Sequence, residues 1–173
     1  MPEIIAIANQ KGGVGKTTTT VNLAAALHEI GKKTLLIDLD TQGNATTACG
    51  IDKNNIRTSV YDLFLGEATM ENTMVYSEAN GFWVLPANKD LMAAEIQLLE
   101  FREREFQLKQ ILTRIDSRFD YVLIDSPPSM NILTLNALAA SHGVIIPAQC
   151  EYYALEGLTG LLETINKIQE KIN

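Results

Sequence analysis

The chain has 173 residues, which is the length of one domain, and its 46% hydrophobic and 20% charged residues are ordinary for a globular protein with a buried core. A net charge of −7 at pH 7 excludes a strongly basic chain, so any surface for nucleic acid or an anionic membrane would have to be local. The opening MPEIIAIANQ lacks the basic segment of a secretory leader and is too short to span a membrane, which predicts a cytoplasmic protein.

Apolar runs that alternate with helical patterns predict an α/β fold: one domain over residues 1–173, with a mostly parallel twisted sheet and helices on both faces. The predicted strands are rich in β-branched residues and nearly continuous in hydrophobicity, as strands covered on both faces should be; they are Ile4–Ala8, Thr34–Leu39, Phe82–Leu85, Tyr121–Ile124 and Val144–Pro147. The predicted helices are Lys16–Ile30, one long or two consecutive helices over Asp90–Ile115, Met130–Ala140 and Leu155–Ile172. The stretch Gly50–Gly81 mixes short helices and turns without clear periodicity.

The first strand leads into the sequence QKGGVG and then into a helix that begins with KTTTT. This strand–loop–helix context is what a phosphate-binding loop requires. Its glycines let backbone N–H groups converge on an anion, and the helix dipole favours negative charge at the same point. Lys16 would supply positive charge to the β- and γ-phosphates, and the Thr17 hydroxyl would bind Mg²⁺. We call residues 10–15 the phosphate loop.

Two acidic residues follow the second strand, in TLLIDLDTQGN. Because side chains alternate along a strand, we expect the carboxylates of Asp38 and Asp40 to lie on one face, near the phosphate loop. Two acids there would repel each other unless a cation lay between them, as Mg²⁺–ATP would provide. The alternative for Asp38 is that it caps the following turn, with Gly43 and Asn44.

A third acidic residue, Asp125, ends the apolar run YVLID. This is the pattern of a Walker B segment, in which the carboxylate holds the metal through water. Pro127 and Pro128 then end the strand. The pattern is weak alone and gains weight from the phosphate loop.

The loop KGGVGKT departs from the simple Walker A pattern, because Gln10 stands where the first glycine is expected. It resembles the deviant Walker A ATPases, which include ParA/Soj partition proteins, MinD and the nitrogenase iron protein. The segments LLIDLDTQGNATT, DYVLIDSPPSMNILTLNAL, VLPANKDLMAAEIQLL and VIIPAQCEYYALEGLTGLL resemble ParA/Soj in particular, and the resemblance runs from Ile4 to about Leu162.

The resemblance implies a slow ATPase with ATP/ADP and Mg²⁺ as ligands. Lys11 would reach the partner's phosphates across an ATP-dependent homodimer, and a ParB-like protein would stimulate hydrolysis during chromosome or plasmid segregation, on the nucleoid. The implied catalytic residues are Lys11, Lys16 and Asp40. The implied metal-shell residues are Thr17, Asp38 and Asp125. The implied nucleotide-binding residues are Lys11, Gly12, Gly13, Val14, Gly15, Lys16, Thr17 and Thr18.

By the same resemblance the chain lacks the last third of the family pattern, which carries residues of the adenine pocket and basic residues for DNA. We therefore expect weak DNA binding or none. The basic residues present are mostly interleaved with acids, for example Lys32, Lys33, Arg102, Arg104, Lys109, Arg114 and Arg118. Two other interpretations stay open, a MinD-like cell-division ATPase and a nucleotide-binding fragment that does not hydrolyse.

The last predicted helix is amphipathic, with the apolar stripe Leu155, Leu158, Leu161, Leu162, Ile165, Ile168 and Ile172. An interfacial membrane helix would normally carry a basic polar face, whereas this one is acidic, so we expect the stripe to pack on the core and expect no membrane partner. The cysteines, Cys49 and Cys150, form no metal-ligand spacing and do not look placed as iron–sulfur ligands; they are interpreted as core or loop residues. The charge-rich FREREFQLKQ is expected to be a solvated helix face.

Overall fold

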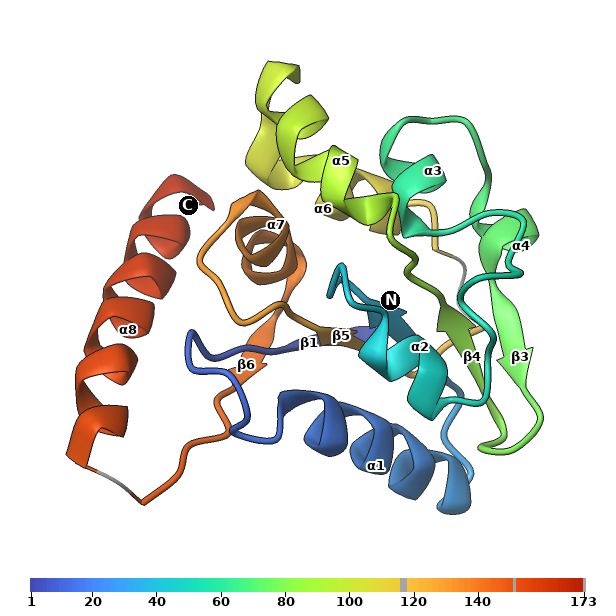
Figure 1. The fold of residues 1–173 in the computed structure, drawn as a ribbon, viewed down its shortest axis with the longest axis horizontal. Helices are drawn as coiled ribbons and strands as arrows, with labels where there is room; N and C mark the ends of the chain where they lie inside the picture. The colour runs from blue at the N-terminus through green and yellow to red at the C-terminus, as the bar shows by residue number, and fades with distance from the viewer. Residues whose placement is uncertain (116–117, 151, 173) are drawn as a thin grey trace.

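The computed structural model describes residues 1–115, 118–150 and 152–172; within the last range, side chains are described for residues 158–170. Its centre is a six-stranded sheet in the order β3-β4-β2-β5-β1-β6 (Figure 1). All neighbouring strands are parallel except β3 and β4, which are antiparallel. The strands are β1 Glu3–Ile7, β2 Thr34–Asp38, β3 Val75–Ser77, β4 Phe82–Leu85, β5 Tyr121–Asp125 and β6 Gly143–Ile145.

Helices cover both faces of this sheet, as the alternation of patterns predicts (Figure 1). One face carries α1 Lys16–Glu29 and α2 Asn44–Ala48. The other face carries α3 Val60–Phe64, α4 Met70–Thr73, α5 Leu91–Gln97, α6 Gln107–Leu112 and α7 Ile132–Ala140. The last helix, α8 Tyr152–Ile172, lies beside α7 at the β6 edge of the sheet.

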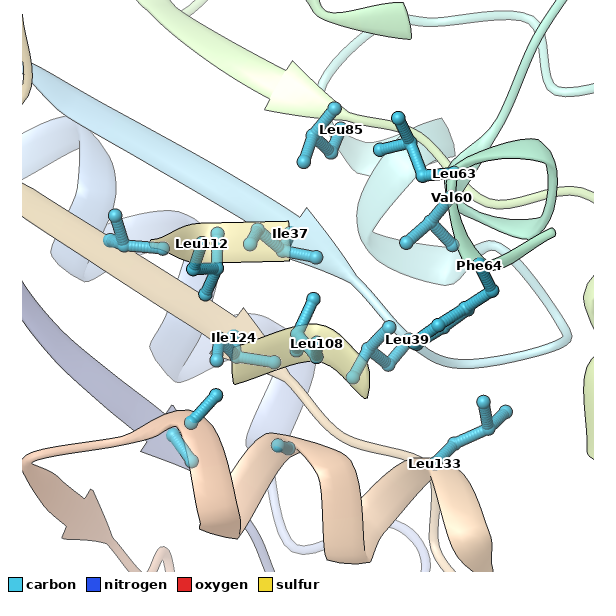
Figure 2. Packing of buried hydrophobic residues seen from close by; sticks show 14 of the residues in the cluster. Ile37, Leu39, Val60, Leu63, Phe64, Leu85, Leu108, Leu112, Ile124 and Leu133 are labelled. Atoms are coloured by element: carbon cyan, nitrogen blue, oxygen red, sulfur yellow. The ribbon is translucent and has the colours of Figure 1, made fainter. Parts of the chain in front are cut away.

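Alternating strand residues divide the core into two clusters. Leu35 and Ile37 of β2 point to the larger cluster, under α3, α5, α6 and α7, while Leu36 between them points to the α1 face. Figure 2 shows part of the larger cluster, in which Leu108 of α6 lies near the ends of β2 and β5 and Leu133 lies on α7. Burial on both faces explains why these strands read as continuous apolar runs.

The stretch Gly50–Gly81 contains a strand that the sequence does not predict. β3 has only three residues, and Tyr76 at its centre is exposed. This is too short for the alternation of apolar and polar residues that marks a strand to be recognised. It pairs with β4 in an antiparallel hairpin and forms one edge of the sheet.

The predicted helix or helices over Asp90–Ile115 are two separate α-helices, α5 and α6, with two 3₁₀ turns between them, Leu98–Glu100 and Arg104–Phe106. The break falls at Glu103, whose positive φ of 53° cannot continue a helix. The expectation that FREREFQLKQ is one solvated helix face is therefore wrong: its first half is a turn, and Leu108 is fully buried.

Part of the apolar stripe of α8 packs on the core, as expected. Leu161 is fully buried, and Ile165 and Ile168 pack against the larger cluster. Leu162 is a correction, because it is exposed rather than in the core. Leu155 and Ile172 lie outside the residues whose side chains are described. Among the described helices, none is both long enough and apolar enough to cross a membrane.

Candidate functional site

The carboxyl ends of β1, β5 and β2 meet side by side, and this places the predicted site residues together. Asp125, the last residue of β5, is in register with Ile7 of β1 on one side and with Asp38 of β2 on the other. The phosphate loop follows β1 directly, so it emerges beside both acids. This is the edge of a parallel sheet at which ligands of α/β proteins bind.

The phosphate loop and the start of α1 leave backbone donors available to an anion. Gly13 and Gly15 have positive φ values of 74° and 92°, which favour glycine. α1 begins at Lys16, and no side chain caps its first turn, so those N–H groups need another acceptor. They border a cavity of about 360 Å³, a fitting place for phosphate oxygens. Its lining residues are Gly12, Gly13, Gly15, Lys16, Thr17, Thr18, Asp40, Asn44 and Pro128.

Lys16 is the cation at the floor of this cavity. Its side chain is buried, and its ammonium nitrogen donates to the backbone carbonyl oxygen of Lys11 at 3.1 Å. Burial lowers the pKa of Lys16, while the nearby carboxylates of Asp125 and Asp40 act against that shift. A buried ammonium group with one neutral acceptor is well placed to exchange that acceptor for an anion.

Asp125 is fully buried and is held by two hydroxyl groups of α1. Thr17 Oγ1 donates to one carboxylate oxygen at 2.7 Å, and Thr20 Oγ1 donates to the other at 3.0 Å. Burial raises the pKa of Asp125 to about 6; the two threonine hydrogen bonds oppose this shift, Asp40 adds to it and Lys16 opposes it. A cation bound nearby would therefore stabilise the ionised form of the Asp125 carboxylate.

Asp38 is also fully buried, and it does not line the cavity. It accepts hydrogen bonds from the Asp40 N–H at 3.0 Å and from the N–H and hydroxyl of Thr46 at 2.8 and 2.7 Å. The Thr46 hydroxyl in turn accepts from the Ala87 N–H at 2.9 Å. Burial raises the pKa of Asp38 to about 7, against the hydrogen bonds from Thr46 and Asp40 and with the added effect of Asp125. Asp38 thus fixes the first turn of α2. This role resembles the alternative in which Asp38 caps the following turn, but the donor is Thr46 rather than Gly43 or Asn44.

Asp40 lines the cavity, whereas Asp38 does not. The prediction that strand alternation places both carboxylates on one face does not apply, because β2 ends at Asp38 and the alternation does not reach Asp40. Asp40 accepts from the Gln42 N–H at 2.9 Å and, at 3.4 Å, from the side-chain amide of Asn44, another lining residue. This leaves a carboxylate facing the space above the phosphate loop.

Lys11 and Val14 belong to the predicted nucleotide-binding set but do not line the cavity. The ammonium nitrogen of Lys11 lies 3.2 Å from the side-chain oxygen of Gln149, in the segment after β6. The backbone carbonyl of Lys11 is what contacts Lys16. The side chains of Lys11 and Lys16 therefore point to different places.

The donor set fits magnesium held together with phosphate, rather than a metal site of protein ligands alone. In the part of the chain that the structure describes, no three His, Cys, Asp or Glu side chains gather closely enough to hold a metal ion. The hydroxyl of Thr17 and the carboxylate of Asp125 lie together beside the cavity. Mg²⁺ prefers such oxygen ligands and completes its shell with water and substrate phosphates.

Sequence reasoning missed several residues of the site. Thr20 lies one helical turn after Thr17, and that spacing within TTTT could have indicated it. Thr46, Asn44 and Pro128 carry no such signal, because only the folded chain brings them to Asp38 and the cavity. The contact between Lys11 and Gln149 spans 138 residues and is likewise invisible in the sequence.

The chain is similar to several known proteins. A family model described as an AAA domain matches residues 2–173. An uncharacterized protein of Pseudomonas putida is 57% identical over all of this chain and 66% of its own length. The sporulation initiation inhibitor protein Soj of Bacillus subtilis is 49% identical over all of this chain and 68% of its own length.

Among solved structures, that of cobyrinic acid a,c-diamide synthase from Mycobacterium smegmatis with bound ADP and magnesium has a TM-score of 0.95 at 45% identity. The match covers 100% of this chain and 70% of that one. The chain thus spans 66% to 70% of the length of these three proteins.

Proposed function

Because this chain belongs to the ParA/Soj type of partition ATPases, as its 45% identity to the chromosome-partitioning ATPase Soj of Treponema pallidum also indicates, we propose that it binds ATP with Mg²⁺ at the phosphate loop and hydrolyses it to ADP and phosphate. The observation that carries the proposal is the cavity at the uncapped start of α1, where Lys16, Thr17 and Asp40 meet. The Mycobacterium smegmatis neighbour, crystallised with ADP and magnesium, supports the choice of ligand.

In this proposal Lys16 turns from the Lys11 carbonyl to the β- and γ-phosphates, and the N–H groups of the loop and of α1 bind the remaining phosphate oxygens. Thr17 and Asp125 would hold Mg²⁺, the hydroxyl directly and the carboxylate through water. Asp38 would act from behind them through its charge, since protein donors already occupy both of its oxygens. When bound, the metal would neutralise charge that develops on the phosphates.

Asp40 would position the attacking water, because it faces the space above the phosphate loop and is oriented by Gln42 and Asn44. In phosphoryl transfer the protein mostly positions groups and balances charge, so a well-held carboxylate suits this role.

Lys11 would serve a second copy of the chain. Its side chain points away from the local cavity, toward Gln149. This fits a residue that reaches a neighbour's phosphates in an ATP-dependent homodimer. The dimer would be the switch that a ParB-like partner resets by stimulating hydrolysis, in the cytoplasm and on the nucleoid, during segregation of a chromosome or plasmid.

The test compares the two lysines. Lys16→Ala should abolish binding of both Mg²⁺–ADP and Mg²⁺–ATP in calorimetry, because bound phosphate loses its charge-assisted donor. Lys11→Ala should keep monomer binding of ADP and lose ATP-dependent dimerisation in analytical ultracentrifugation. Lys89→Ala, which removes an exposed lysine outside the cavity, is the matched control and should behave like the unmodified protein. Equal loss of ADP binding in both loop variants would show that Lys11 acts on its own nucleotide.

A further inference from the structure

A second cavity lies at the end of the sheet opposite the phosphate loop. It has a volume of about 370 Å³ and opens where β2 and β4 begin, at Thr34 and Phe82. Asp38 marks the other end of β2, so the two cavities are separated by the length of that strand, roughly 13 Å for four residue steps. None of the residues lining this second cavity lines the first.

Aromatic rings form the wall of this cavity. Tyr76 and Trp83 meet edge to face with their ring centroids 5.4 Å apart, and each stays 39% exposed. Phe82 and Phe119 line the same cavity and are buried. Large exposed aromatic rings next to buried ones give a flat ligand a surface for stacking and edge contacts.

Cationic side chains line the cavity as well. Lys32 and Lys33 come from the turn between α1 and β2, and Arg118 comes from the segment before β5. Arg118 lies 5.9 Å from the centre of the Phe119 ring and 4.0 Å from Glu71, so part of its charge is balanced. Among the residues that the structure describes, no carboxylate lies within ion-pair distance of the Lys32 or Lys33 ammonium group.

A buried hydroxyl group in the cavity has no hydrogen-bond partner. Thr34 is 2% exposed, lines the cavity, and its Oγ1 is one of few buried side-chain atoms in the described chain without a partner. Leaving such a group unpaired costs free energy. An acceptor oxygen that reached it from the cavity would satisfy it.

The cavity wall is also closely fitted at one point. Gly81, in the turn between β3 and β4, has a positive φ of 78°, and a Cβ there would collide with the imidazole of His28. Figure 1 shows the end of α1, which carries His28, reaching this turn. Segments far apart in the sequence thus meet to shape the cavity.

We propose that this cavity binds a small aromatic anion, with its ring against Trp83 and Tyr76 and its anionic group at Lys32, Lys33 and the Thr34 hydroxyl. The Asp120 carboxylate accepts from the Lys33 N–H at 2.8 Å but forms no ion pair with either ammonium group. The ligand class follows from the combination of rings, ammonium groups without an ion pair and an unpaired donor in a cavity large enough for a small molecule. A nucleotide and an aromatic carboxylate share this chemistry. The site is separate from the ATP site and does not depend on it.

Trp83 is the only tryptophan in the chain, so its indole N–H gives a single ¹⁵N–¹H signal that reports on this cavity. The titrations use saturating Mg²⁺–ADP, which occupies the phosphate loop. The probes are 2-naphthoate, adenosine 5′-monophosphate, inorganic phosphate and 2-naphthylmethanol. We expect a saturable shift with 2-naphthoate, adenosine monophosphate or both, which identifies the ligand source, and binding at least about tenfold weaker for the anion alone and the ring alone.

The decisive variant is Lys32→Ala combined with Lys33→Ala. It should weaken binding of the tightest-binding probe roughly tenfold, because the ion pairs between the probe and two exposed lysines are lost. Lys89→Ala combined with Lys109→Ala removes the same charge elsewhere on the surface and should leave binding unchanged. Thr34→Val should weaken binding of the same probe, while the ligand-free variant should be at least as stable as the unmodified protein. The proposal is overturned if no aromatic anion gives a saturable Trp83 shift at millimolar concentration, or if both double variants bind alike.

Discussion

Replacing Thr46 by valine tests how Asp38 is held, because one hydroxyl group links two segments. Thr46 is fully buried; its Oγ1 accepts from the Ala87 N–H at 2.9 Å and donates to Asp38 at 2.7 Å. Valine has the same shape and can do neither. The Ala87 N–H, in a buried residue, loses its acceptor, and the Asp38 carboxylate keeps two of its three donors.

The size of the effect depends on pH, because burial raises the pKa of Asp38 to about 7. A raised folded-state pKa means that the stability contributed by this group is present below the unfolded value near 3.8 and is lost as pH rises through about 7. At pH 5 the variant loses an acceptor for Ala87 and a hydrogen bond to a mostly neutral acid, about 2 kcal/mol. At pH 8 the acid is ionised and the lost donor matters more, so we expect about 4 kcal/mol.

The measurement is urea unfolding of the nucleotide-free protein at both pH values. Thr47→Val is the matched control: the Thr47 hydroxyl donates to the Gly43 carbonyl at 3.0 Å from an exposed residue, and its loss should change stability by less than about 0.5 kcal/mol. A Thr46→Val protein as stable as the control at both pH values would refute the argument from the unpaired Ala87 N–H. Equal destabilisation at pH 5 and pH 8 would refute the titration of Asp38 between them.

Three further outcomes are expected. Asp40→Ala should keep ATP bound and slow phosphate release strongly, since the water loses its orienting carboxylate; normal turnover would remove Asp40 from the mechanism. In a thiol-reagent assay at pH 8, Cys150 should react quickly and Cys49 slowly, because Cys150 is exposed while burial raises the pKa of Cys49 to about 12; two fast thiols in the folded protein would contradict this. Fluorescence anisotropy with a nonspecific duplex and Mg²⁺–ATP should show weak binding at physiological salt, given a net charge of −7, whereas tight, salt-sensitive binding would place a DNA surface within these 173 residues.

The strands were predictable from the sequence because a strand that is buried on both faces has a continuous apolar run. β4 has the predicted bounds, Phe82–Leu85, and the other four predicted strands differ by one or two residues at their ends. β3 was not predictable, because a three-residue edge strand with one buried residue has neither length nor period. The break between α5 and α6 depends on the positive φ of Glu103. Glutamate rarely adopts this left-handed conformation, so the sequence gives no sign of the break.

Part of the site followed from topology alone. Residues after parallel strands meet at one edge, so the approach of Thr17 to Asp125 could be expected. The different surroundings of Asp38 and Asp40 could not, because they depend on where β2 ends and on a hydroxyl from α2. The direction of the Lys11 side chain depends on Gln149, which only the folded chain brings near.

The strand order has a consequence for how the protein is made. The contact between Thr17 and Asp125 joins residues 108 positions apart, and β1 pairs with β5 and β6, which come last among the described strands. At translation rates of 5–20 residues per second, roughly 5–20 s separate the synthesis of the two residues. During that time β1 has no partner strand and the phosphate loop has no acid beside it. The phosphate loop is thus synthesised before most of the sheet that completes its site, and an unpaired β1 is the kind of exposed strand that chaperones shield.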